Sequence, residues 1–483
     1  MNATPGGIIQ VPVATLRPER FRALLGDSWA EIETGIARAV ELFSGRAVWH
    51  INSTARGGGV AELLQSLLAY TRGAGVDARR AVVTAGPEFF AVTKRIHNQL
   101  HGAGGDGGRL GEDERAIYEQ TLARAADELA RLVRPGDIVF CHDPQTAGLV
   151  EPMVEAGTTV VWRCHVGLDL PNETARETWD FLRSYVTPAH AYVFSRREHV
   201  WAGLADERIW IVAPSIDAFS PKNQELSTET VEAILARAGL GPARDGAAGI
   251  FERFDGSPGR VDRAAEIDQD DLIPADAPLL VQVSRWDRLK DPTGVLRGFA
   301  EHTVHDAAHL MLAGPSVAAV SDDPEGAEVL ADVRRLREEL PSTIRERVHL
   351  ACLPMDDVEE NAAIVNAIQR RAQVVVQKSL AEGFGLTVAE AMWKARPMVA
   401  SRAGGIQDQI VDGVTGVLLD DPRDLATFGR ACDELLTDPE RAARIGTAAR
   451  EWVIEGFLGP RHLVQYLRLL DGLIAGRQAA EDG

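Results

Sequence analysis

Short apolar runs alternate with stretches of helical periodicity along the first half of the chain. Residues 27–43 and 60–71 carry apolar side chains at the spacing of amphipathic helices. Six short apolar runs are typical of buried strands, namely 47–52, 81–84, 137–140, 158–162, 191–194 and 209–212. Buried strands that alternate with helices predict a parallel sheet covered on both faces.

The alternation stops near residue 216 and starts again near residue 279. Residues 216–275 are polar and rich in Gly, Pro, Asp and Arg, which indicates a linker and an insertion near 240–270. Six further apolar runs follow, at 279–283, 310–313, 348–350, 374–376, 398–400 and 416–419. We therefore predict an α/β protein of two Rossmann-like, doubly wound domains that face a cleft. Their expected bounds are 1–215, joined by a C-terminal helix within 456–483, and 216–455.

Polar side chains follow two predicted strands of the first domain. His142 and Asp143 come after the run 137–140, and Arg163 and His165 come after the run 158–162. Doubly wound domains bind ligands at the carboxyl ends of their strands, and these residue types suit hydroxyl-rich or phosphorylated ligands. Capping of the helices that follow is the alternative.

Three glycines, Gly57, Gly58 and Gly59, separate another strand of this domain from its helix. Glycine lets the backbone approach a ligand, and a helix start offers N–H groups to an anion or a hydroxyl. A plain tight turn is the alternative.

In the second domain, Arg285 and Lys290 follow the strand run 279–283. A guanidinium fork and a compact ammonium at a strand-to-helix turn suit a diphosphate. A second segment, EGFGLTVAEAM, follows the run 374–376 and opens a helix. Its glycines would leave N–H groups exposed to phosphate at the helix start. Glu382 stands before this helix and Glu390 lies about two turns into it, so the two carboxylates need not share a face.

The composition of the chain argues against some classes of binding partner. The 483 residues include 51 Lys or Arg and 71 Asp or Glu, a net charge of −20, and no basic block occurs. This balance argues against nucleic acid as a partner. The four cysteines form no CxxC pair, and each lies in or beside an apolar run, which predicts buried reduced thiols. The sequence shows neither a secretory leader nor an apolar run of about 18 residues, so we expect a cytoplasmic protein without a membrane partner.

The segments EGFGLTVAEAM, with Glu-x7-Glu, and SRWDRLKDP resemble the retaining nucleotide-sugar glycosyltransferases of family 4, which have the GT-B fold. Within that group the chain resembles the glycosyltransferring trehalose synthases over most of residues 45–455, except the insertion. The segments that carry this likeness are HINSTARGGGVAELLQSLLAYTRGAGVDAR, FFAVTKRIHNQLHG, CHDPQTAGL, WRCHVGLDLPN, APSIDAFSPKN and VVVQKSLAEGFGLTVAEAMWKARP.

The resemblance implies a reaction and a role for each candidate residue. A nucleoside-diphosphate glucose would donate glucose to free glucose, reversibly and with retention, to give α,α-trehalose. Arg285 and Lys290 would hold the diphosphate, Glu382 the transferred glucose and Glu390 the ribose. Donor contacts are also implied for Gly383, Phe384, Gly385, Leu386 and Thr387. The acceptor wall would comprise Gly57, Gly58, Gly59, His142, Asp143 and Arg163, and His165 would join the catalytic set.

The resemblance implies no metal site and no required cofactor; a divalent cation would stimulate at most. The leaving phosphate itself would take the acceptor proton. Several choices stay open from sequence: a uridine, adenosine or guanosine donor; a sugar phosphate or a cyclitol as acceptor; and a retaining trehalose phosphorylase that uses glucose 1-phosphate. A sugar-nucleotide-binding regulator without turnover is a further alternative. The oligomeric state, a homodimer included, is also left open.

Overall fold

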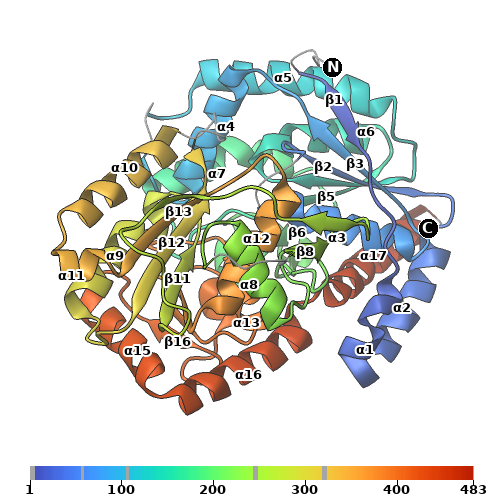
Figure 1. Ribbon diagram of the computed structural model, residues 1–483. Coiled ribbons are helices and arrows are strands. Elements are labelled where there is room, and N and C mark those ends of the chain that lie inside the picture. Colours follow the sequence, from blue (N-terminus) through green and yellow to red (C-terminus); the bar gives the residue numbers. More distant parts are fainter. Residues whose placement is uncertain (1–5, 56–58, 105–107, 243–247, 318–323, 482–483) are drawn as a thin grey trace. The chain divides into compact units, whose positions relative to one another are not determined.

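A computed structural model describes residues 6–55, 59–104, 108–242, 248–317 and 324–481. The chain divides into two compact units (Figure 1). Unit 1 comprises Met1–Ser215 and Phe457–Gly483, and unit 2 comprises Ile216–Gly456.

Unit 1 contains a seven-stranded sheet in the order β1-β3-β2-β4-β5-β6-β7. The strands are β1 (Ile8–Val11), β2 (Ala47–Asn52), β3 (Asp77–Val83), β4 (Ile138–His142), β5 (Thr159–Cys164), β6 (Ala191–Phe194) and β7 (Ile209–Ile211). All pairs are parallel except β1 with β3. The six predicted strands are confirmed. A seventh strand that was not predicted, β1, pairs with β3 as an edge strand before residue 25.

Unit 2 contains a second seven-stranded sheet, in the order β10-β13-β12-β11-β14-β15-β16. Its strands are β10 (Glu266–Asp268), β11 (Leu279–Val283), β12 (His309–Pro315), β13 (Val348–Leu353), β14 (Val374–Gln377), β15 (Met398–Ser401) and β16 (Val417–Leu419). Only β10 is antiparallel to its neighbour. The insertion adds a small hairpin, β8 (Ile250–Glu252) with β9 (Pro258–Arg260). The six strands predicted here are also confirmed.

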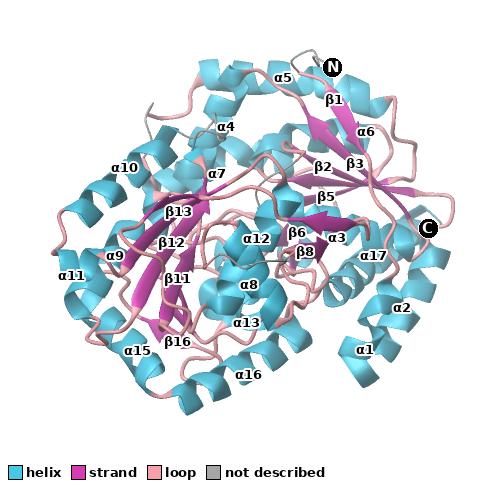
Figure 2. Ribbon diagram, viewed as in Figure 1, coloured by secondary structure: helices cyan, strands magenta, loops and turns pink. Residues whose placement is uncertain are grey.

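Helices connect the strands of both sheets (Figure 2). Those of unit 1 are α1 (Arg22–Leu25), α2 (Trp29–Leu42), α3 (Gly59–Gly73), α4 (Pro87–Leu100), α5 (Glu112–Ala130), α6 (Val150–Glu155), α7 (Glu173–Val186) and α17 (Gly459–Glu481). Those of unit 2 are α8 (Thr228–Arg237), α9 (Pro292–His302), α10 (Pro324–Glu338), α11 (Ser342–Arg345), α12 (Val358–Arg371), α13 (Leu386–Trp393), α14 (Ile406–Gln409), α15 (Leu425–Thr437) and α16 (Pro439–Gly456).

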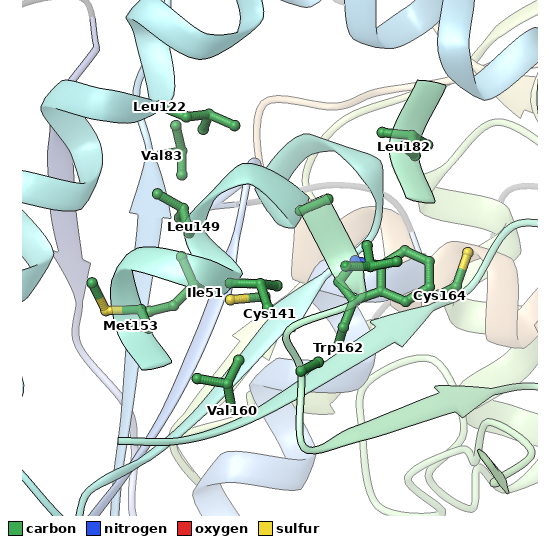
Figure 3. Close-up of a cluster of buried hydrophobic side chains, with 14 of the residues drawn as sticks. Ile51, Val83, Leu122, Cys141, Leu149, Met153, Val160, Trp162, Cys164 and Leu182 are labelled. Carbon is green, nitrogen blue, oxygen red and sulfur yellow. The ribbon is translucent and has the colours of Figure 1, made fainter. Parts of the chain in front are cut away.

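Two apolar layers cover the sheet of unit 1. On one face, Ile51, Cys141 and Trp162 of neighbouring strands pack with Met153 of α6 and Leu122 of α5 (Figure 3). On the other face, α17 from the end of the chain packs on α2 and α3 and contributes to a second cluster with the strands. Apolar side chains of successive strand positions alternate between these layers, as burial on both faces requires.

The sequence also makes predictions about the cysteines and about membrane-spanning segments. The four cysteines are buried and unpaired, as predicted. Of the helices in the described ranges, none is long and apolar enough to cross a membrane.

Candidate functional site

The carboxyl end of β11 carries the two predicted cations of unit 2. Arg285 follows the strand with about half of its side chain exposed and forms an ion pair with Asp287 at 2.9 Å. Lys290 ends a short 3-10 turn, whose start Asp287 caps by accepting from the N–H of Leu289 at 2.8 Å. The Lys290 ammonium forms an ion pair with Glu382, which follows the neighbouring strand β14. The structure therefore brings together two groups that the sequence places 92 positions apart.

Close backbone contact fixes the loop that carries Glu382. The Gly405 N–H donates to the Gly383 carbonyl at 3.1 Å. A Cβ atom at Gly404, which has φ +49°, would lie 1.6 Å from the Glu382 carbonyl oxygen. Gln409 donates to the Phe384 carbonyl at 2.6 Å, and Phe384 is buried. Glycine at 404 is thus required by contact as well as by its backbone angle.

Helix α13 begins directly after this loop. Gly385 is its N-terminal cap, with φ +84°, and Leu386 and Thr387 are its first residues. The first turn of an α-helix leaves N–H groups without partners inside the helix, and the helix dipole favours an anion there. The helix start therefore offers donors beside the Lys290–Glu382 pair, in the same loop.

Glu390 lies farther along α13 and is 4% exposed. One carboxylate oxygen lies 3.6 Å from the Lys222 ammonium. The other oxygen is buried and accepts no hydrogen bond from the described residues. A buried carboxylate oxygen without a donor is an acceptor site for a ligand hydroxyl. One turn later, burial holds the pKa of Lys394 well below its usual value, and its ammonium donates to Asn223, Gln369 and the Glu390 carbonyl.

A second buried lysine supports the loop of Lys290. Lys378 follows β14, is fully buried, and pairs with the carboxylate of Asp291. Its ammonium also donates to the Pro422 carbonyl at 2.7 Å. Asp291 has φ +50° and caps α9 through the N–H of Gly294 at 3.0 Å. No motif in the sequence predicts this role for Lys378. The scarcity of lysine, five of 51 basic residues, was a signal that could have pointed to it.

In unit 1, the predicted residues His142, Asp143, Arg163 and His165 lie together at the ends of β4 and β5. His142 and Arg163 are direct partners in the strand register. The Asp143 carboxylate accepts from the His165 backbone N–H at 2.7 Å, and Asp143 has φ +64°. Burial raises the pKa of Asp143 to about 7, although this hydrogen bond and the nearby Arg163 lower it. Asp143 thus fixes the backbone that carries His165.

Several polar residues of this site were missed from sequence. His50 of β2 bonds to His142, with 2.9 Å between ring nitrogens. Arg80 of β3 donates to Asn52 at 3.2 Å and to the Thr54 carbonyl at 2.7 Å. From α17, the Tyr466 ring lies 5.6 Å from the Arg163 guanidinium carbon. A histidine inside the otherwise apolar run 47–52 was a visible signal, whereas no local pattern marks Tyr466.

The glycine run is only partly described. Gly57 and Gly58 lie outside the described residues, and Gly59 is the exposed first residue of α3. Within the described ranges, no group of three or more His, Cys, Asp or Glu side chains is arranged to hold a metal ion.

Comparison with known proteins places this arrangement in a family. Residues 50–201 match the family model "Trehalose synthase, N-terminal domain", and residues 264–452 match "Glycosyl transferases group 1". The trehalose synthase of Rubrobacter xylanophilus is 37% identical over 434 residues, which cover 89% of this chain and 91% of that protein. The chain belongs to the trehalose synthase family. The trehalose synthase of Pyrococcus furiosus is 35% identical over 94% of this chain and 97% of its own length.

Solved structures agree on the fold. Sucrose-phosphate synthase from Thermosynechococcus elongatus has a TM-score of 0.61 at 18% identity, covering 89% of this chain and 100% of that one. An alpha,alpha-trehalose-phosphate synthase (UDP-forming) from Burkholderia vietnamiensis has a TM-score of 0.62 at 16% identity, covering 90% and 98%. The predicted GT-B fold is therefore confirmed, and the protein is a glycosyltransferase of trehalose metabolism. A more distant relative, trehalose phosphorylase of Grifola frondosa, is 24% identical over 87% of this chain and 56% of its own length.

Proposed function

We propose that this enzyme transfers glucose from a nucleoside-diphosphate glucose to free glucose, with retention, to form α,α-trehalose reversibly. The observation that carries this proposal is the grouping of Arg285, Lys290 and Glu382 beside the start of α13. Two cations next to free helix N–H groups suit a diphosphate, and a carboxylate in the same loop suits the hydroxyls of the attached sugar.

The donor would extend along unit 2 in a fixed order. Arg285 and Lys290 would hold the diphosphate, together with backbone N–H groups from Gly383 to Thr387. Glu390 would accept from the ribose, because its second oxygen is buried without a donor among the described residues. A phosphorylase that uses glucose 1-phosphate has no ribose to bind, so this unsatisfied carboxylate favours a nucleotide donor.

Unit 1 would supply the residues that bind the acceptor and the reacting sugar. His142, Asp143, Arg163 and His165 lie at the carboxyl ends of its central strands, where doubly wound domains bind ligands. Gly57, Gly58 and Gly59 would complete this wall. Half-buried His165 would bond to a hydroxyl group through its Nδ1 atom, whereas both ring nitrogens of His142 already bond to His50 and His165.

The proposed chemistry places the acceptor on the same face of the sugar as the leaving group. The bond from C1 to the phosphate oxygen breaks, the bond from C1 to the acceptor oxygen forms, and the acceptor proton passes to the leaving phosphate. The resemblance implies no carboxylate nucleophile of the kind that retaining two-carboxylate hydrolases use. Catalysis would then rest on positioning and on Arg285 and Lys290, which stabilise the charge of the departing diphosphate.

The test is incubation of the purified protein with UDP-, ADP- or GDP-glucose and free glucose, with the sugars resolved by NMR. We expect an α,α-linked disaccharide and one released nucleoside diphosphate per disaccharide. A disaccharide formed only from glucose 1-phosphate would instead establish the phosphorylase. Products formed only with a sugar phosphate or a cyclitol would refute glucose as the acceptor, and binding without turnover would indicate a regulator.

A further inference from the structure

Three histidines of unit 1 form a continuous chain, with His50 in β2, His142 in β4 and His165 directly after β5. His50 Nδ1 lies 2.9 Å from His142 Nε2, and His142 Nδ1 lies 3.1 Å from His165 Nε2. Successive rings lie 5.2 Å and 5.4 Å apart between centroids and are nearly parallel. His50 and His142 are 3% and 1% exposed, so water does not compete for these bonds.

Arg163 fixes the direction of every proton in this chain. Its Nε–H donates to His165 Nε2 at 3.1 Å. A guanidinium stays protonated in proteins, so His165 Nε2 carries no proton and must be the acceptor. His142 Nδ1 faces the same nitrogen and is assigned a proton, since two bare nitrogens would repel each other; the single lone pair of His165 Nε2 is then shared by two donors, Arg163 and His142. A neutral His142 then accepts at Nε2, and His50 must donate from Nδ1.

The surroundings keep all three rings neutral. Burial, helped by the charges of Arg163 and Arg80, lowers the pKa of His50 to about 3. Burial likewise holds the pKa values of His142 and His165 well below their usual value, helped by Arg163. The Asp143 carboxylate accepts from the His165 backbone N–H at 2.7 Å, and among the described residues no histidine ring donates to it.

Arg163 is itself held in place. Its second terminal nitrogen donates to the Val212 carbonyl at 2.9 Å, and its guanidinium lies over the Tyr466 ring from α17. His165 is the half-buried end of the chain, and among the described residues none bonds to its Nδ1 atom. A neutral His165 whose Nε2 is bare carries its proton on Nδ1.

We propose that Arg163 sets His165 as a neutral hydrogen-bond donor to the sugar, with its proton on Nδ1, and that His50 and His142 are positioning residues that hold the His165 ring in this state. This inference rests on the proposed function, in which His165 contacts substrate. It gives His165 a definite role: the ring supplies a proton-bearing nitrogen to a sugar oxygen and takes no proton from the acceptor. The acceptor proton is then left to the departing phosphate.

The tautomers are measured directly by NMR of the whole protein labelled with 15N only in histidine. Variants at His50, His142 and His165 assign the three rings. We expect each to be neutral at pH 7 with its proton on Nδ1. Resonances that place the His165 proton on Nε2, or on both nitrogens, overturn the proposal whether or not the enzyme is active.

Two substitutions at His50 separate the proton direction from packing. His50→Asn keeps an N–H donor facing His142, whereas His50→Asp presents a carboxylate that draws the His142 proton to Nε2. We expect kcat for trehalose formation to fall on the order of 10- to 100-fold in His50→Asp, the usual cost of losing an orienting partner. His50→Asn should recover most of that loss, and the KM for donor should change little in both.

A matched control lies in unit 2, where His309 and His349 make a similar contact at 2.9 Å between ring nitrogens. His309→Asp introduces the same charge there and should leave kcat unchanged. Equal kcat values for His50→Asp and His50→Asn would overturn the positioning role. If His50→Asp does not fold, the NMR measurement of the histidine tautomers in the wild-type protein decides whether the proposal holds. A wild-type protein that forms no trehalose refutes the proposed function, and the tautomer measurement still gives its own answer.

Discussion

Lys290 and Glu382 form an ion pair at the carboxyl ends of the neighbouring parallel strands β11 and β14. Their side chains are 16% and 11% exposed, so the pair is largely shielded from solvent. The positive charge proposed to receive a diphosphate is thus already neutralised within unit 2. A bound diphosphate would have to compete with Glu382 for Lys290, and the freed carboxylate could then turn to the sugar.

Glu382→Gln tests this competition. The neutral amide no longer holds Lys290, so we expect the affinity for a nucleoside diphosphate to rise by about two- to tenfold, the worth of a partly shielded ion pair. The value of kcat should fall, because the contact with the transferred glucose is weakened. Titration calorimetry with UDP, ADP and GDP and a steady-state assay measure the two effects. Weaker nucleotide binding in this variant would contradict the competition.

Lys290→Ala removes a charge-assisted contact that would strengthen as the diphosphate leaves. Such a hydrogen bond contributes about 1.5–3 kcal/mol. We therefore expect both nucleotide affinity and kcat/KM to fall by about 10- to 100-fold. Arg288→Ala is the matched control, since Arg288 lies two positions away and pairs with Glu328 at 3.0 Å on the surface. Unchanged kinetics in Lys290→Ala would rule out its role in the diphosphate site.

Lys378→Met tests the support beneath this loop. The substitution leaves the carboxylate of Asp291 without its buried cation, and breaking such a pair costs about 3–5 kcal/mol. We expect a clear loss in the free energy of unfolding, measured by chemical denaturation. The double variant Lys378→Met with Asp291→Asn should lose less than the sum of the single losses. Strict additivity would show that the two side chains stabilise the protein independently.

Apolar periodicity predicts the sheets of this protein well, because their central strands are buried on both faces. Val374–Gln377 and Met398–Ser401 are buried throughout and read as short apolar runs. The edge strand Ile8–Val11 has the sequence IIQV, yet its positions are only partly buried or exposed, so its apolar residues do not indicate a strand buried on both faces. The three-residue strands of the insertion are too short for any period to emerge.

The residues of the candidate site likewise include some that the sequence predicts and some that it does not. Arg285, Lys290 and Glu382 stand directly after predicted strands, where the topology itself indicates ligand residues. His50 lies inside a strand and not after its end, and its role depends on its contact with His142 in β4. Tyr466 reaches Arg163 from a helix near the end of the chain, and only the three-dimensional structure could reveal that contact.

Gly404→Ala should disrupt the loop that carries Glu382. A Cβ atom there would lie 1.6 Å from the Glu382 carbonyl oxygen, so the backbone must move. We expect a loss of nucleotide affinity together with a lower unfolding temperature. Gly413→Ala is the control for backbone strain alone, because Gly413 has φ +74° but no atom within 4 Å of its Cβ position. Equal effects of the two substitutions on nucleotide affinity would show that contact with Glu382 does not set the loop.

The buried histidines of unit 1 predict how stability depends on pH. In the unfolded chain a histidine has a pKa of about 6.5. The folded pKa of His50 is about 3, so between these values the unfolded chain binds a proton that the folded protein does not. The free energy of unfolding therefore falls as pH falls through this window, by about 1.4 kcal/mol per pH unit for each such ring. His142, His165 and His462 have lowered pKa values and act in the same sense.

Asp143 has the opposite effect on how stability depends on pH. Its folded pKa is raised to about 7, so it contributes stability at low pH that is lost as pH rises from about 4 to 7. The contribution of this one carboxyl to the free energy of unfolding offsets that of about one histidine. The group as a whole should therefore make the protein more stable at neutral pH than at acidic pH. As the pH falls below 6.5, the free energy of unfolding of His50→Asn should fall by about 1.4 kcal/mol less per pH unit than that of wild type. Denaturant titration between pH 7 and 4.5 measures this difference. The control His302→Asn, at a partly exposed ring, should follow wild type. A slope unchanged by His50→Asn would mean that His50 is protonated in the folded protein, contrary to the hydrogen-bond chain.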